Sequence, residues 1–216
     1  MTPAGPHGPG LPRLQAILDL DAAEAAGWAV SDLLAAFLDG GAQCIQIRAK
    51  HLASAPLLAL CELAVREAAP YRAAIIVNDR PDLAVLAGAA GVHVGQDDLA
   101  PAAARAIVGA DAIVGCSTHT VEQVEAAVRE PVSYIAVGPV FGTRTKNTGH
   151  DAVGLDFVAT AARLAAPLPV VAIGGITLTN AVSVVDAGAA AVAIISDLLV
   201  DKDVAGRTRA YLRRLA

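Results

Sequence analysis

The sequence predicts a single (β/α)8 TIM barrel, in which eight parallel strands alternate with helices. Eight short apolar segments alternate with segments of helical periodicity over about 200 residues, the size at which this barrel begins. The apolar segments are hydrophobic along nearly their whole length, as strands are in a parallel sheet covered on both faces. A doubly wound open sheet is the alternative, but Asp19-Leu20-Asp21 follows the first strand where that fold needs glycines.

The barrel is expected to occupy residues 13–216. Residues 1–12 contain seven Pro and Gly residues and no periodicity, so a disordered N-terminal tail is expected there. The predicted strands are Leu14–Leu18, Cys44–Ile47, Ala74–Val77, Gly91–Val94, Ala112–Cys116, Tyr134–Val137, Val170–Ile173 and Ala191–Ile195. The predicted helices are Ser31–Leu38, Ala53–Ala69, Pro81–Ala87, Pro101–Val108, Val121–Arg129, Leu155–Leu164, Thr179–Ala187 and Val204–Leu215.

Composition argues against several classes of protein. The net charge is −5 and the basic residues are scattered, which argues against a nucleic-acid partner. No apolar run reaches the roughly 20 residues needed to cross a bilayer, and no signal-peptide pattern opens the chain. Cys44, Cys61 and Cys116 are odd in number and lack metal-ligand spacing, which is typical of reduced thiols in the cytoplasm. The sequence leaves open whether the protein forms a homo-oligomer.

Function in such a barrel lies at the carboxyl ends of the strands. After the second strand, Gln46, Arg48 and Lys50 share one face, because alternate side chains of an extended segment point the same way. One amide and two cations aimed into the barrel mouth would bind an anion, since Arg forks onto phosphate and Lys acts as a point charge. The alternative is a solvated strand edge.

Two carboxylates follow the third and fourth strands. The third apolar run stops at Val77-Asn78-Asp79-Arg80 and the fourth at Gly95-Gln96-Asp97-Asp98, with a helix from Pro81 between them. Because parallel strands joined by a helix end at the same edge of the sheet, Asp79 and Asp98 are expected to face each other. Mg²⁺ is usually held by one or two carboxylates together with water and substrate phosphates. The pair therefore predicts a Mg²⁺ site; alternatively, each carboxylate caps the helix after it.

Polar groups also follow the fifth and sixth strands. Ser117 lies at a helix start, where its hydroxyl can bind an anion or cap the helix. His119 has no carboxylate neighbour in the sequence, and no catalytic role is assigned to it. The sixth strand opens into a long polar segment, in which Thr143, Thr145 and Lys146 would bind a second anion.

The seventh and eighth strands end in the loops that most often hold a phosphate in this barrel. Gly174 and Gly175 follow the seventh strand and allow the backbone to approach a ligand closely. Ile195 and Ser196 follow the eighth strand. A phosphate site is therefore expected between these two loops.

Taken in order, these strand ends resemble thiamine-phosphate synthase. The motifs that carry the resemblance are Gln46–Lys50, Asn78-Asp79-Arg80, Gly91-Val92-His93 with Gly95–Asp98, Ser117-Thr118-His119, Gly138–Lys146 and Ala172–Ile176. They match the family's pattern from about Leu14 to Ser196 in order and spacing. The resemblance implies a barrel transferase of thiamine biosynthesis. That enzyme joins a pyrimidine, carried as 4-amino-2-methyl-5-hydroxymethylpyrimidine diphosphate, to a thiazole phosphate and releases pyrophosphate to form thiamine phosphate.

The resemblance also implies a role for each matching residue. The pyrimidine diphosphate would be bound by Gln46, Arg48, Lys50 and Asn78, and the Mg²⁺ by Asp79 and Asp98. The pyrophosphate or the pyrimidine would be bound by Ser117 and Lys146. The thiazole phosphate would be held by Thr143, Thr145, Gly174, Gly175, Ile195 and Ser196. The residues assigned to catalysis are Lys50, Ser117 and Lys146, because the leaving pyrophosphate needs neutralisation and the reaction needs no protein nucleophile.

Two other functions are weighed against this one. A thiazole tautomerase-like isomerase would use only the thiazole phosphate, and a non-catalytic phosphate-ligand-binding barrel would show binding without turnover. The isomerase relatives lack the full diphosphate and metal set, whereas this chain keeps all of its members, Lys50, Asp79, Asp98 and Lys146. The residues therefore favour the synthase.

Overall fold

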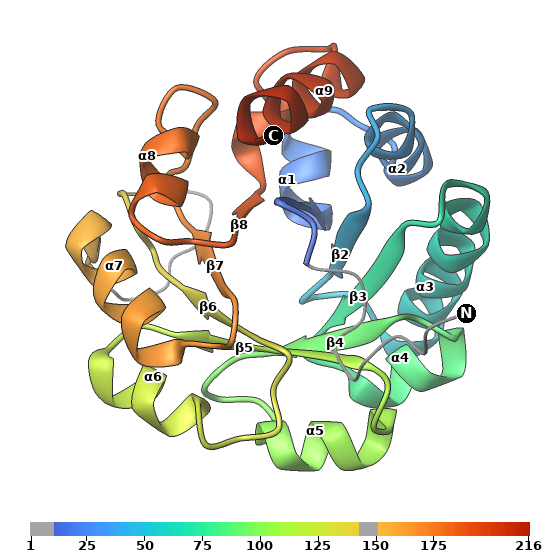
Figure 1. Ribbon diagram of the computed structural model, residues 1–216. Coiled ribbons are helices and arrows are strands. Elements are labelled where there is room, and N and C mark those ends of the chain that lie inside the picture. Colours follow the sequence, from blue (N-terminus) through green and yellow to red (C-terminus); the bar gives the residue numbers. More distant parts are fainter. Residues whose placement is uncertain (1–10, 143–150) are drawn as a thin grey trace, which may run out of the picture.

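A computed structural model describes residues 11–142 and 151–216. Its eight strands pair in parallel and in chain order, and β8 returns to β1 to close a barrel that the helices surround (Figure 1). The predicted (β/α)8 barrel is thereby confirmed. Residues 1–10 of the predicted tail lie outside the described residues, as do Thr143, Thr145 and Lys146.

Each predicted strand boundary lies within two residues of the observed one. The strands are β1 (Leu14–Asp19), β2 (Cys44–Arg48), β3 (Ala74–Asn78), β4 (Gly91–Val94), β5 (Ile113–Thr118), β6 (Tyr134–Val137), β7 (Val170–Ile173) and β8 (Ala191–Ile194). The α-helices are α1 (Leu20–Ala25), α2 (Val30–Asp39), α3 (Ser54–Ala68), α4 (Pro81–Ala87), α5 (Pro101–Val108), α6 (Val121–Ala127), α7 (Gly154–Ala165), α8 (Ala181–Asp186) and α9 (Val204–Leu215). Two short 3-10 helices are η1 (Ala69–Tyr71) and η2 (Ser196–Leu199).

Alternate residues of the strands fill two different layers. Side chains such as Ile17, Tyr134 and Val171 form an apolar cluster inside the barrel. Their neighbours along the strands, such as Ile135 and Ala172, belong to a larger cluster shared with the helices. Because both faces of the sheet are covered, the strands need no polar face and are mostly apolar, with buried exceptions such as Gln46, Asn78 and His93.

Two of the differences from the sequence-based prediction have a visible cause. Helix α1 was not predicted; it begins because the Asp19 side chain accepts a hydrogen bond from Ala22 N at 2.9 Å and so caps it. Helix α8 begins at Ala181 rather than Thr179. The residues before it form a turn in which Thr177 N donates to Asn180 Oδ1 at 2.7 Å, and this turn replaces the first residues of the predicted helix.

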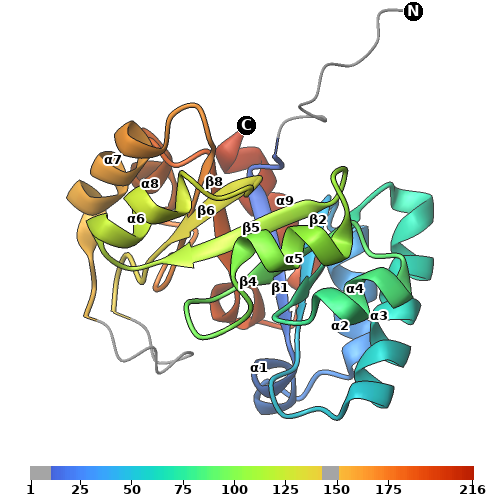
Figure 2. The same ribbon diagram turned by 90° about the horizontal axis from the view of Figure 1, so that it is seen from below.

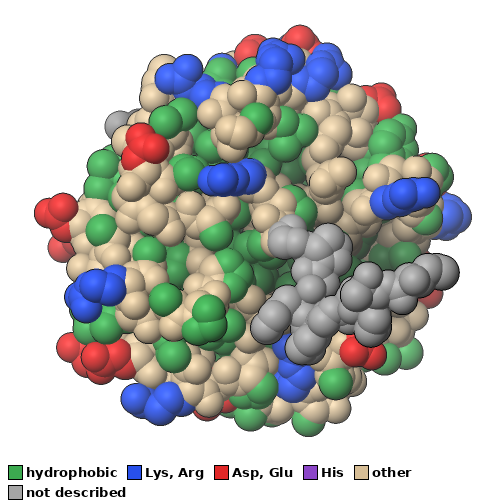
Figure 3. Space-filling view, viewed as in Figure 1, with side chains coloured by type: hydrophobic (Ala, Val, Ile, Leu, Met, Phe, Trp, Pro, Cys, Tyr) green, Lys and Arg blue, Asp and Glu red, His purple; other side chains and the backbone are tan. Residues whose placement is uncertain are grey.

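The barrel has two distinct ends. Figure 2 shows the start of β1 at one end and α1 at the other, so the carboxyl ends of the parallel strands open on the α1 side. Figure 3 shows the opposite face, where Lys and Arg side chains are spread around the edge among Asp and Glu. Within residues 11–142 and 151–216, no helix combines the length and apolarity needed to cross a membrane.

Candidate active site at the carboxyl ends of the strands

The ends of β1 and β2 carry an ion pair. Asp19 and Arg48 are register partners in the two strands, and Arg48 Nη1 donates a short hydrogen bond to Asp19 Oδ2. The Arg48 side chain is mostly buried, and its Nε has no hydrogen-bond partner among the described residues. Gln46, two residues earlier on the same face, is only 3% exposed. Asp19 therefore fixes a guanidinium that keeps one donor unused, and the sequence analysis missed this partner.

Three charged groups meet at the ends of β2, β3 and β4. Lys50 Nζ lies 3.4 Å from Asp79 Oδ2, and the Asp98 carboxyl group is close enough to interact with the Asp79 side chain. Burial first, and then the neighbouring Asp98 carboxyl, raise the pKa of Asp79, while Lys50 acts in the opposite direction. The two carboxylates thus face each other as the sequence predicted. They repel each other, and Lys50 offsets only part of that repulsion.

Neither carboxylate caps a helix. The N-cap residues of α4 and α5 are Arg80 and Ala100, and neither helix start has a side-chain cap. Asp98 Oδ2 instead accepts a hydrogen bond from Gly95 N at 2.7 Å within its own loop. Asp79 adopts a left-handed backbone conformation with φ of 64°, which is uncommon outside glycine and concentrated at functional sites. The helix-capping alternative is therefore wrong for both residues.

The donor set at Asp79 and Asp98 suits a hard divalent cation. Oxygen ligands from one or two carboxylates, completed by water and substrate phosphates, are the usual environment of Mg²⁺. Among the described residues, no group of three or more His, Cys, Asp or Glu side chains gathers in a way that would hold a metal on its own. The pair therefore fits a metal that arrives with a phosphorylated substrate better than a closed structural metal site.

A buried histidine links β4, β5 and β6. His93 Nδ1 lies 2.8 Å from the Tyr134 hydroxyl, and His93 Nε2 lies 2.8 Å from Ser117 Oγ. Gly115 makes room for this contact, because a Cβ there would lie 2.1 Å from the Tyr134 ring. The cap of α6 is Thr120, whose hydroxyl accepts from Gln123 N at 3.3 Å. Ser117 therefore does not cap that helix; its hydroxyl contacts His93, to which the sequence analysis assigned no role.

His119 contacts the backbone of the loop that follows β6. Its Nδ1 lies 2.5 Å from the carbonyl oxygen of Gly138, and its backbone N–H donates to Gln123 Oε1 at 2.7 Å. The side chain thus joins the end of β5 to the loop that follows β6.

The loop after β7 needs its two glycines for packing. Gly174 has φ of 102°, and a Cβ on it would lie 2.5 Å from Pro139 Cα. Gly175 has φ of 62°, and its Cβ would lie 2.7 Å from the Gly142 carbonyl oxygen. Glycine is required at both positions, because any side chain would collide with the loop after β6.

The end of β8 leads directly into η2. Ile195 is 8% exposed, whereas Ser196 is exposed. Four residues predicted to bind the phosphate are described by the structure, and they lie in the loops after β7 and β8: Gly174, Gly175, Ile195 and Ser196. Thr143, Thr145 and Lys146 remain outside the described residues.

Comparison with known proteins gives a consistent result. The sequence model of a family described as thiamine monophosphate synthase matches residues 19–198. A thiamine-phosphate synthase of Koribacter versatilis is 43% identical over 193 residues, covering 88% of this chain and 90% of the relative. One of Thermus thermophilus is 42% identical over 192 residues, covering 88% and 92%. A solved thiamine phosphate pyrophosphorylase from Pyrococcus furiosus has a TM-score of 0.85 at 27% identity, covering 94% and 95% of the two chains.

Proposed function

This chain belongs to the thiamine-phosphate synthase family, and we propose that its strand ends join the pyrimidine of a hydroxymethylpyrimidine diphosphate to a thiazole phosphate. The chain is thus a transferase of thiamine biosynthesis. In the reaction, the bond between the exocyclic pyrimidine carbon and the diphosphate oxygen breaks. A bond from that carbon to the thiazole nitrogen forms, and pyrophosphate leaves.

The observation that carries the proposal is the cluster of Lys50, Asp79 and Asp98. Among the residues that the structure describes, Lys50 pairs with Asp79 beside the second carboxylate, and the trio keeps a net negative charge when ionised, which still attracts a cation. We assign the pair to Mg²⁺, which would supply neutralising charge to the pyrophosphate as it leaves. Lys50 lies at the rim, with 47% of its side chain exposed, so its ammonium can reach a diphosphate while it remains beside Asp79.

The pyrimidine diphosphate is assigned to the ends of β2, β3 and β5. Arg48 supports this assignment, because Asp19 orients its guanidinium and its Nε donor is unused within the described residues. Gln46 and Asn78 are largely buried inward-facing amides that would recognise the pyrimidine ring. Ser117, oriented by His93, would donate to a pyrophosphate oxygen.

The thiazole phosphate is assigned to the loops after β7 and β8, through Gly174, Gly175, Ile195 and Ser196. The residues predicted in the loop after β6, Thr143, Thr145 and Lys146, stay part of the proposal on the strength of the sequence resemblance. The protein then needs no nucleophile or strong base, because positioning two substrates and stabilising charge are sufficient.

A cytoplasmic location is proposed as well. Cys44, Cys61 and Cys116 are buried free thiols. Burial raises the pKa of Cys44 to about 12, which keeps that thiol protonated and unreactive. These features support a protein that keeps its cysteines reduced.

The proposal is tested by incubating the purified protein with both substrates and Mg²⁺ and measuring thiamine phosphate and pyrophosphate. Both products should appear in equal amounts and only when all three components are present. Conversion of the thiazole phosphate in the absence of the pyrimidine would instead indicate an isomerase. Binding of either substrate without any product would indicate a non-catalytic barrel.

A further inference from the structure

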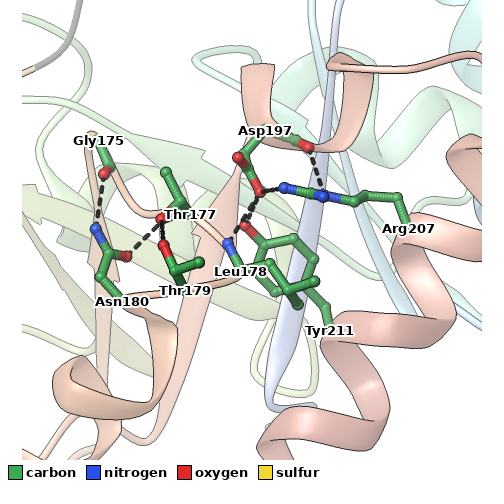
Figure 4. A network of polar contacts seen from close by, with 8 residues as sticks. All are labelled: Gly175, Thr177, Leu178, Thr179, Asn180, Asp197, Arg207 and Tyr211. Atoms are coloured by element: carbon green, nitrogen blue, oxygen red, sulfur yellow. Dashed lines mark hydrogen bonds and ion pairs between the residues drawn. The ribbon is translucent and has the colours of Figure 1, made fainter.

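Asp197, the residue after Ser196, connects three segments that are distant in the sequence. Its Oδ2 accepts hydrogen bonds from Leu178 N at 3.0 Å, from Arg207 Nη2 at 2.7 Å and, at short range, from the Tyr211 hydroxyl (Figure 4). Arg207 Nε also donates to the Asp197 carbonyl oxygen at 3.1 Å. One carboxylate oxygen therefore holds together the loop after β7, the start of η2 and helix α9.

The loop after β7 is itself stiffened by a second set of contacts. Asn180 Nδ2 donates to the Gly175 carbonyl oxygen at 3.2 Å, and Asn180 Oδ1 accepts from Thr177 N at 2.7 Å. The Thr177 and Thr179 hydroxyls lie 2.8 Å apart (Figure 4). Hydrogen bonds through Asn180 therefore fix the Gly175 carbonyl relative to this turn. The turn is itself fixed to Asp197, because Leu178 N donates to its carboxylate.

A buried carboxylate is otherwise unfavourable at this position. Asp197 is 9% exposed, and a buried carboxylate is stable only when its charge is paired. The Arg207 guanidinium and two further donors supply that compensation. Burial, together with the Asp197 carboxylate, raises the pKa of Tyr211, so the phenol stays protonated and remains a donor.

We propose that Asp197 is a positioning residue for the thiazole phosphate. It fixes the backbone of Gly174–Gly175 relative to Ile195–Ser196, the two segments assigned to that phosphate, by tying both loops to α9. Asp197 does not touch the substrate; it sets the distance between the groups that do. The role rests on the proposed function and extends it to the C-terminal helix.

The test compares Asp197→Asn with the wild type in steady-state kinetics and in calorimetric binding of the thiazole phosphate alone. Asparagine keeps the size of the side chain but replaces one acceptor oxygen by an NH2 donor and removes the negative charge that pairs with Arg207. We expect KM and Kd for the thiazole phosphate to rise about tenfold, equivalent to about 1.4 kcal/mol. The KM for the pyrimidine diphosphate should stay within about twofold of the wild-type value.

Two control variants separate positioning from general loss of stability. Asp186→Asn changes an exposed carboxylate on α8 and should leave both KM values unchanged. Thr208→Val removes a buried hydrogen bond to Val204 O inside α9 and should destabilise the protein without altering the thiazole phosphate KM. Tyr211→Phe removes one of the donors to Asp197 and should raise the thiazole phosphate KM by about threefold. This variant tests the positioning role if Asp197→Asn fails to fold.

The outcomes distinguish this inference from the function on which it rests. If the wild type makes no thiamine phosphate, the proposed function fails. If the wild type is active but neither Asp197→Asn nor Tyr211→Phe changes thiazole phosphate affinity, the positioning role is overturned. An equal rise in Thr208→Val would overturn it too, because the effect would then follow from destabilised packing of α9.

Discussion

Lys50 and Asp79 form an ion pair across the carboxyl ends of β2 and β3, with Nζ 3.4 Å from Oδ2. Asp98 approaches the same carboxylate, so Asp79 has both a lysine and a second carboxyl group as neighbours. The formal charge of the trio is negative when all three groups are ionised. Asp79 therefore combines a raised pKa with a place in the proposed Mg²⁺ site, and two predictions concern it directly.

Replacing Asp79 by asparagine should lower turnover by about 100-fold or more, because a metal ligand contributes several kcal/mol of charge stabilisation in the transition state. Asparagine is the right substitution because it tolerates the left-handed backbone that this position adopts. Steady-state rates should be measured across a Mg²⁺ titration. Asp98→Asn should behave in the same way, whereas Asp97→Asn, an exposed neighbour, should stay within about twofold of wild type. Wild-type rates and metal dependence in both Asp79→Asn and Asp98→Asn would refute the metal assignment.

Asp79 should also make the metal-free protein less stable as pH rises. Burial, followed by the Asp98 carboxyl, raises its pKa in the folded state above the unfolded value of 3.8. A carboxyl with a raised pKa contributes stability that is fully present below the unfolded value and is lost as pH rises through the folded one. Thermal unfolding without Mg²⁺ should therefore show Asp79→Asn gaining stability relative to the wild type as pH rises above about 4.

Adding Mg²⁺ supplies the control for this experiment. A cation that binds only the folded state raises its stability. Mg²⁺ should thus raise the unfolding temperature of the wild type more than that of Asp79→Asn. If the wild type instead gained stability relative to Asp79→Asn as pH rises in metal-free buffer, the assigned direction of the Asp79 pKa would be contradicted.

The fold was predictable from the sequence because two independent signals indicate each strand: its apolar composition and the polar turn that follows it. Covered parallel strands are apolar throughout, so their limits stand out against polar loops. Helix α1 was missed because its first residues, Leu20 and Asp21, carry no helical periodicity and its cap, Asp19, belongs to the preceding strand. The signal was present as an aspartate at a strand end, but a six-residue helix is too short to show a period.

The site was predictable only where neighbouring strand ends decide it. Asp79 and Asp98 face each other because β3 and β4 are joined by one helix and run parallel, which the sequence indicated. The contact of His93 with Tyr134 depends instead on which residues of β4 and β6 point inward and on the space left by Gly115. Pairing of that kind depends on strand register and on the inward direction of each side chain, which no local pattern in the sequence encodes.

The His93–Tyr134 contact leads to a prediction about stability. Tyr134→Phe should lower the free energy of unfolding by about 1–3 kcal/mol, because it leaves a buried imidazole nitrogen without its hydroxyl partner. Tyr71→Phe is the matched control, since the Tyr71 hydroxyl bonds Asp39 on the exposed surface and should contribute less than about 1 kcal/mol. Urea denaturation of both variants measures the difference. Equal losses of unfolding free energy in the two variants would show that the buried His93–Tyr134 contact stabilises the protein no more than an exposed one.

Because the two substrates are assigned to two sides of the barrel, Lys50→Ala and Ser196→Ala should each raise the KM of a different substrate. Lys50 lies beside Asp79, so its removal takes charge from the leaving group; kcat should fall and KM for the pyrimidine diphosphate should rise, each by about tenfold. Ser196 is exposed at the start of η2, and losing its hydroxyl should raise only the thiazole phosphate KM, by about threefold.

Ser196 is a better position than Gly174 or Gly175 at which to test binding of the thiazole phosphate. A side chain on Gly174 would collide with Pro139, so a kinetic defect there would combine misfolding with lost binding. Initial rates should be measured for each variant with one substrate saturating and the other varied. If Ser196→Ala raised the pyrimidine diphosphate KM alone, or Lys50→Ala raised only that of the thiazole phosphate, the two substrates would have to exchange sides. The pairing of Lys50 and Asp79 would then serve the thiazole phosphate, and the metal would have to be reassigned with it.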